Sequence, residues 1–117
     1  MFFIPDDTKE DYERCGVANN PNTPPEALER LANDKFWLVR GKVAINPNTS
    51  PETLERLAND DDLVRQCVAE NPNTSPETLE RLANDENWWV RRSLIRNLNT
   101  PQYIKDYLKL KQFLSCL

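Results

Sequence analysis

The chain has 117 residues, of which 38% are hydrophobic and 29% charged, and its formal net charge is −4. This length supports one modest core and excludes two ordinary domains. No stretch approaches the roughly 18 apolar residues of a membrane span. The start, MFFIPDD, lacks the basic leader of a secretory signal. The absence of histidine removes the commonest general base and the commonest metal ligand.

The three cysteines, Cys15, Cys67 and Cys116, are odd in number and far apart. A disulfide framework needs an even and dense set, so we expect reduced thiols and a cytoplasmic location. The wide gaps exclude a local metal knuckle. We expect Cys67 to pack inside the protein and Cys116 to be exposed, with no metal and no cofactor bound.

A tetrapeptide recurs at steps of 26, 25 and 26 residues, as NPNT at 20–23, 46–49 and 71–74 and as NLNT at 97–100. Between the copies run PEALERLAND at 25–34 and PETLERLAND at 51–60 and 76–85. Each of these phrases is followed after a short gap by Val-Arg. Self-similarity at a fixed period is the signature of a tandem repeat array.

The repeats divide the chain in order. Residues 1–19 are expected to form an N-terminal cap and a partial unit, and 20–45, 46–70 and 71–96 to form three full repeats. Residues 97–117 are expected to start another first helix, with Ile104, Tyr107 and Leu108 on its apolar face, and to end as a cap. Terminal units depart from a repeat pattern because one of their faces meets water.

Each full repeat predicts two helices. In the second repeat, the first helix is expected to begin at Thr49, which forms a capping box with Glu52. Leu54, Leu57 and Ala58 then share one face at helical spacing. Equivalent residues recur in the other two repeats.

The second helix of each repeat is short, about two turns, and part of it is expected to be 3₁₀. Asp34, Asp60 and Asp85 are its candidate N-caps, and Val64 and Val68 begin its apolar stripe in the second repeat. Neither helix buries its face alone, so stacking must supply the core. The pattern predicts an all-α solenoid of two-helix units without strands.

The string Val-Arg-x₃-Ala-x-Asn-Pro-Asn-Thr-x-Pro-Glu-x-Leu-x₂-Leu-Ala-x-Asp resembles the leucine-rich repeat variant family over roughly residues 11–108. The resemblance implies a right-handed superhelix of alternating α and 3₁₀ helices, used for interaction rather than catalysis. The family is also associated with an iron–sulfur cysteine cluster ahead of the repeats. No such cluster is present here, so we do not carry that cofactor over.

HEAT repeats offer a looser similarity, because they place an aspartate six residues before an arginine that follows a valine. Asp34 and Arg40 keep this spacing, as do Asp85 and Arg91, while Asp60 and Arg65 lie one residue closer.

The arginine column, with Arg14 at its start, has two interpretations. It lines a groove for an anionic ligand, or it forms an internal ladder with the aspartates that ties one unit to the next. We favour the ladder, because the aspartates recur in step with the arginines. The asparagine columns, which include Asn46 and Asn71, are expected to stabilise tight turns.

The aromatic residues Phe36, Trp37, Trp88 and Trp89 lie at the junctions between first and second helices. They form either an exposed anchor patch for a partner or hydrophobic cover over the edge of the core. Trp89 shares its column with Leu38 and Leu63, which favours cover. For Trp37 and Trp88 both interpretations stay open.

Charge is split along the chain. Residues 1–90 carry a net charge of −9, and residues 91–117 carry +5. The basic end, with Arg92 and Arg96, either binds an anion or is a solvated cap. A groove-wide nucleic-acid binder is basic along its whole length, and this body is acidic. The apolar residues near the end, Leu110, Phe113, Leu114 and Leu117, are a candidate homodimer seam.

We therefore predict a non-catalytic protein–protein interaction scaffold whose acidic body favours a partner with a basic segment. The partner-binding candidates are Phe36, Trp37, Trp88, Arg92 and Arg96. The alternative is binding of nucleic acid or another polyanion through the basic C-terminal end. An enzymatic role would need a pocket with perturbed titratable groups, and the lack of histidine speaks against it.

Overall fold

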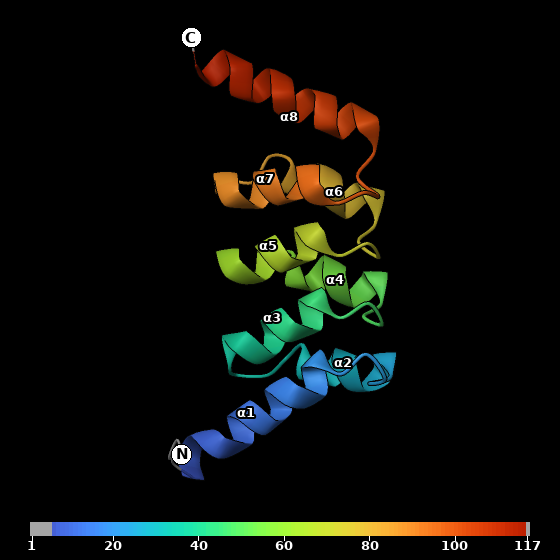
Figure 1. Ribbon diagram of the computed structural model, residues 1–117, viewed down its shortest axis with the longest axis vertical. Coiled ribbons are helices and arrows are strands. Elements are labelled where there is room, and N and C mark those ends of the chain that lie inside the picture. Colours follow the sequence, from blue (N-terminus) through green and yellow to red (C-terminus); the bar gives the residue numbers. More distant parts are fainter. Residues whose placement is uncertain (1–5, 117) are drawn as a thin grey trace.

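The computed structural model describes residues 6–116. This part of the chain contains eight α-helices and no strand: α1 (Asp6–Asn19), α2 (Pro25–Leu31), α3 (Trp37–Ile45), α4 (Pro51–Leu57), α5 (Asp62–Glu70), α6 (Pro76–Leu82), α7 (Trp88–Arg96) and α8 (Gln102–Ser115). The helices are stacked along the long axis of a particle of 52 × 27 × 22 Å (Figure 1). The predicted all-α repeat solenoid is confirmed.

Two layers make up the stack. The second helices α1, α3, α5 and α7 pack on one another in succession, and each short first helix packs on the second helices before and after it. In Figure 1 the first helices α2, α4 and α6 lie along the right side. The core runs continuously between the layers, with Leu54 and Leu79 of the first helices and Val39, Val64 and Val90 of the second helices fully buried.

The first helices begin at a proline rather than at the threonine before it. In the second repeat the side chain of Ser50 accepts a hydrogen bond from the Thr53 backbone N–H, and Ser75 caps the third repeat in the same way. The predicted capping box at Thr49 is therefore wrong. The hydroxyl of Thr49 is buried and donates to the carbonyl of Val43 in the last turn of α3, which also accepts from the backbone N–H of Asn46.

The second helices begin later than predicted, and all nine residues of each are α-helical, with no 3₁₀ segment in residues 6–116. Their N-cap residues are Phe36, Asp61 and Asn87. The predicted caps Asp34, Asp60 and Asp85 are therefore wrong, because these residues lie one or two positions before the observed N-caps and their carboxylates accept bonds from arginines.

The end of the array departs from the repeat pattern. Ile104 and Leu108 of α8 are buried as predicted, but Tyr107 is 43% exposed, and its hydroxyl donates to the Asn84 side chain. Across the described residues, none of the helices has the length and apolar character that a membrane span requires.

Candidate interaction surfaces

The arginine column forms a ladder with the aspartates of the following repeat. Arg40 donates from Nε and Nη2 to the two carboxylate oxygens of Asp60, at 2.8 and 3.1 Å, and from Nη1 to the backbone carbonyl of Asp34. Arg65 makes the same three bonds to Asp85 and to the carbonyl of Asp60. In each case the acceptor carboxylate lies 20 residues beyond the arginine, so the fork joins two consecutive repeats.

Internal pairing uses up the charges of this ladder. The hydrogen bond from Arg14 is the largest influence on Asp34 and lowers the pKa of its carboxyl. For Asp85, burial is the largest influence and raises the pKa, but hydrogen bonds from Arg65 and from a backbone N–H outweigh it, so the pKa is lowered overall. Carboxylates held in this way act as parts of the framework rather than as acids or bases.

Arg91 breaks the ladder. It donates to the backbone carbonyl of Asp85, as the other arginines do to theirs, but the position 20 residues further on is Lys111. Within residues 6–116, no carboxylate lies at ion-pair distance from Arg91. The last rung of the ladder is therefore open.

The asparagine columns also join the repeats. The buried side-chain amide of Asn71 donates to the carbonyls of Ala44 and Asn46, where the first repeat meets the second, at 2.7 and 3.0 Å. Its oxygen accepts from the backbone N–H of Asn73, which closes the turn. Asn46 and Asn97 repeat this arrangement. These residues satisfy backbone groups inside the stack and leave no donor for a ligand.

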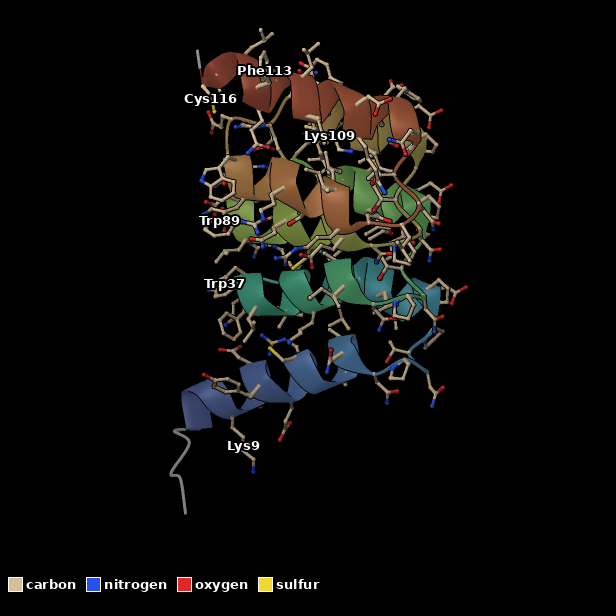
Figure 2. The ribbon with its side chains drawn as sticks, turned by 45° about the horizontal axis from the view of Figure 1, so that its top comes forward. Lys9, Trp37, Trp89, Lys109, Phe113 and Cys116 are labelled. Carbon is tan, nitrogen blue, oxygen red and sulfur yellow. The ribbon has the colours of Figure 1, made fainter. Side chains whose placement is uncertain are left out.

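Aromatic and aliphatic side chains, most of them exposed, gather along one side of the second helices. We call this surface the aromatic edge; it comprises Tyr12, Phe36, Trp37, Leu63, Trp88 and Trp89. Figure 2 shows Trp37 and Trp89 on the same side of the stack. Tyr12, Phe36 and Trp37 form a chain of edge-to-face contacts, with ring centroids 6.1 and 6.4 Å apart.

The predicted candidates are not equally placed on this edge. Phe36 is half-buried against the core, whereas Trp37 and Trp88 are 42% and 48% exposed. The expectation that Trp89 covers the core is wrong, because it is 51% exposed and stacks on Trp88 with ring centroids 4.3 Å apart. The guanidinium of Arg92 lies 5.6 and 6.0 Å from the two indole centroids, a cation–π arrangement.

Sequence reasoning missed two members of the aromatic edge, Tyr12 and Leu63. Leu63 is 51% exposed at the start of α5. The sequence did hold a sign that Leu63 belongs to this edge, because Leu63 occupies the column of Trp89 and the second repeat is one residue shorter at this junction. Three carboxylates, Asp61, Asp62 and Glu86, are exposed on the same edge between the aromatic residues.

A second surface lies between α7 and the C-terminal half of α8. It is a groove of about 830 Å³ that contains Arg91, Arg92 and Arg96 from α7 and Lys111 from α8. Trp88, Ile95 and Leu108 supply its apolar part. Among residues 6–116, no carboxylate lines the groove, and four of the six basic residues of the segment 91–117 lie there.

The remaining apolar residues of α8, Leu110, Phe113 and Leu114, are 56%, 62% and 56% exposed. Leu117, the last member of the predicted dimer seam, lies outside the described residues. The seam stays a prediction.

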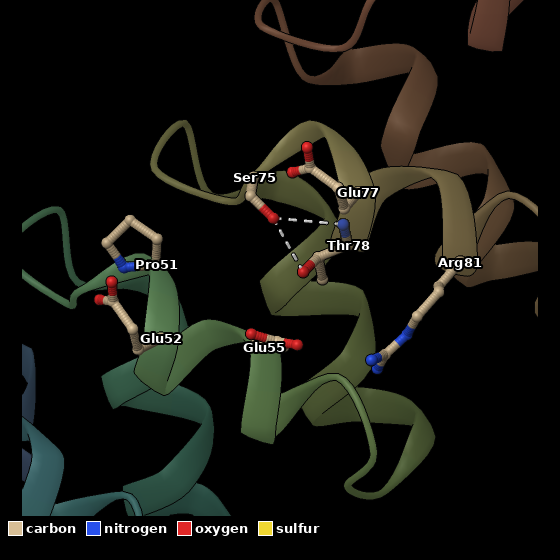
Figure 3. A pocket seen from close by; sticks show the side chains of 7 residues that line it. All are labelled: Pro51, Glu52, Glu55, Ser75, Glu77, Thr78 and Arg81. Atoms are coloured by element: carbon tan, nitrogen blue, oxygen red, sulfur yellow. Dashed lines mark hydrogen bonds between the residues drawn. The ribbon is translucent and has the colours of Figure 1, made fainter.

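A smaller pocket of about 310 Å³ opens between α4 and α6. Figure 3 shows that its carboxylates, Glu52, Glu55 and Glu77, surround a region in which Ser75 bonds to Thr78. The serine and threonine are thus occupied by the helix cap. Within the described residues, no three His, Cys, Asp or Glu side chains are arranged to hold a metal ion.

Thiol reactivity should follow burial. Cys15 is buried, and burial also raises the pKa of the half-buried Cys67 to about 11. Cys116 is exposed, so the reagent reaches it freely and it should be alkylated first. Iodoacetamide labelling of the folded protein in mildly alkaline buffer, followed by peptide mass spectrometry, measures the three rates. Fast labelling of Cys67 would contradict this expectation.

The geometry defines a class, the α-helical repeat proteins, in which each unit is tied to the next through its loops. Within that class, the Leucine Rich Repeat Variant domain model matches residues 40–97 and the Leucine rich repeat variant model matches residues 13–36. The chain belongs to the leucine-rich repeat variant family, whose members are helical repeat modules generally linked to protein interaction and typically non-catalytic. Comparisons with curated proteins and with solved structures gave no match.

Proposed function

We propose that this protein is a non-catalytic scaffold that binds another protein through its aromatic edge. The observation that carries the proposal is the exposure of three tryptophans, Trp37, Trp88 and Trp89, on one side of a stack whose framework charges are internally paired. Half-exposed tryptophan is the residue type that most often dominates the energy of a protein interface.

The chemistry of the edge indicates the kind of partner segment. Asp61 and its neighbour Asp62 lie between the tryptophans of the first and third repeats. Asp61 is 67% exposed and only 3.5 Å from Arg40, and Asp62 accepts from Asn87 at the surface, so both carboxylates are accessible to a partner. A segment with basic residues flanking an apolar one would pair with these carboxylates while burying the indoles. Because hydrogen bonds join each repeat to the next, the surface is preformed and binding costs little ordering entropy.

The test is affinity capture from native lysate with the wild-type chain and the Trp89→Ala variant, with and without nuclease. We expect a stoichiometric protein that survives nuclease and moderate salt and whose recovery falls about tenfold with Trp89→Ala. Circular dichroism should show unchanged helicity, because the side chain is half-exposed.

Leu98→Ala is the matched control. Leu98 is 92% exposed in the turn after α7, outside the aromatic edge, so its loss should leave recovery unchanged. Equal loss with both variants would contradict the proposal. Recovery that depends on nucleic acid would instead support the polyanion alternative.

A further inference from the structure

The groove between α7 and α8 carries an inference beyond the aromatic edge. It combines the basic residues Arg91, Arg92, Arg96 and Lys111 with an apolar part, and none of the described residues that line it carries a carboxylate. The question is which anion its chemistry would recognise.

The preceding repeats show what the arginines of this column bind. In the two preceding repeats, Arg40 and Arg65 each hold one aspartate through a two-bond fork while a third bond anchors the guanidinium to a backbone carbonyl. Arg91 keeps the anchoring bond to the Asp85 carbonyl, but Lys111 stands at the position of the missing aspartate. The fork of Arg91 is therefore oriented by its own repeat and lacks a carboxylate from residues 6–116.

We propose that this groove is a docking site for an acidic linear segment of a partner protein, with an aspartate or glutamate of that segment completing the ladder at Arg91. Arg92 and Arg96 then add positive charge from α7. The apolar surface of Trp88, Ile95 and Leu108 receives an aliphatic side chain beside the acid.

Charge distribution favours a short acidic peptide over nucleic acid. Residues 1–90 carry a net charge of −9, and this acidic body begins immediately before Arg91. A polyanion longer than the groove would extend its phosphates toward carboxylates such as Glu86 and be repelled. A short segment confines its charge to the groove, and planar carboxylates match the fork that the ladder already uses.

The test measures fluorescence anisotropy of labelled peptides with the full chain. The probes are a short peptide of alternating Asp and Leu, the same peptide with Asn in place of Asp, and a single-stranded oligothymidylate of matched charge. We expect the Asp peptide to bind the chain at physiological salt at least about tenfold more tightly than either of the other probes.

Two charge-matched variants locate the site. Lys111→Asp puts a carboxylate at the open position and should lower the affinity for the Asp peptide about tenfold or more. Lys109→Asp changes the net charge equally, but its exposed side chain does not line the groove, so binding should stay within about twofold. Circular dichroism checks that both variants remain helical.

Three results would overturn the proposal. Equal weakening by the two lysine variants would mean diffuse attraction rather than a groove. Tighter binding of the oligothymidylate would assign the groove to nucleic acid. Self-association in sedimentation that Lys111→Asp abolishes, with no peptide binding, would make a second copy of this chain the occupant. The aromatic edge is tested with a different variant, so either proposal can fail alone.

Discussion

Replacing Asn71 with alanine is expected to lower the free energy of unfolding by about 4 kcal/mol. The substitution removes three hydrogen bonds inside the stack and leaves the carbonyl of Ala44 without its donor, whereas that of Asn46 keeps the backbone N–H of Thr49. Each lost bond is worth about 1 kcal/mol, and each buried group left unsatisfied adds a further penalty. Urea denaturation followed by circular dichroism measures the change.

Asn20→Ala is the matched control for this prediction. Asn20 stands in the same column but is exposed, and its side-chain oxygen accepts only the turn bond from Asn22. Its replacement should cost about 0.5–1 kcal/mol. A similar loss for the two variants would mean that the asparagine column stabilises single turns and does not join repeats.

Arg65→Met is expected to lower the free energy of unfolding by about 3 kcal/mol. Both partners are largely shielded, with side-chain exposures of 18% for Arg65 and 8% for Asp85. The substitution leaves the carboxylate of Asp85 nearly buried without its fork and removes a donor from the Asp60 carbonyl. Arg91→Met, which loses only the bond to the Asp85 carbonyl, should cost about 1 kcal/mol.

The same pair predicts a dependence on pH. In the wild type the pKa of Asp85 is lowered, so its stabilising contribution is present at neutral pH and is lost as the pH falls through that lowered value. In Arg65→Met the hydrogen bond from Arg65 that lowers the pKa of Asp85 is absent, and burial raises this pKa. Protonation of Asp85 then removes an unpaired, shielded charge and stabilises the variant. The difference in unfolding free energy should therefore shrink below about pH 4. A difference that stays constant as the pH falls below that value would contradict the role given to Asp85.

The repeat architecture could be predicted from the sequence because it depends on regular spacing. The leucines of the first helices and the valines of the second recur at i, i+3 and i+4, and such stripes bury the same way in every repeat. The caps could not be assigned, because serine, threonine and aspartate are all capping residues. The choice between Thr49 and Ser50 depended on the position of the Val43 carbonyl, to which the Thr49 hydroxyl donates, and that position is a tertiary property.

The candidate surfaces were only partly visible in the sequence. Column sharing suggested that Trp89 is covered, but exposure at the start of a helix depends on neighbouring loops, and the shorter second repeat leaves Leu63 exposed too. The missing aspartate partner of Arg91 could have been predicted from the sequence. The sequence analysis compared each arginine with the aspartate six residues before it, in the same repeat. The ion pairs instead join each arginine to the aspartate 20 residues after it, in the next repeat.

The central claim is that an exposed aromatic edge on a rigid, internally paired stack binds a protein partner. The most direct measurement is calorimetric titration of the purified captured partner with the wild-type chain, Trp37→Ala, Trp89→Ala and Leu98→Ala. We expect the Kd to rise about tenfold or more for each tryptophan variant and to stay within about twofold for Leu98→Ala, with helicity unchanged throughout. Unchanged affinity in both tryptophan variants would contradict the claim.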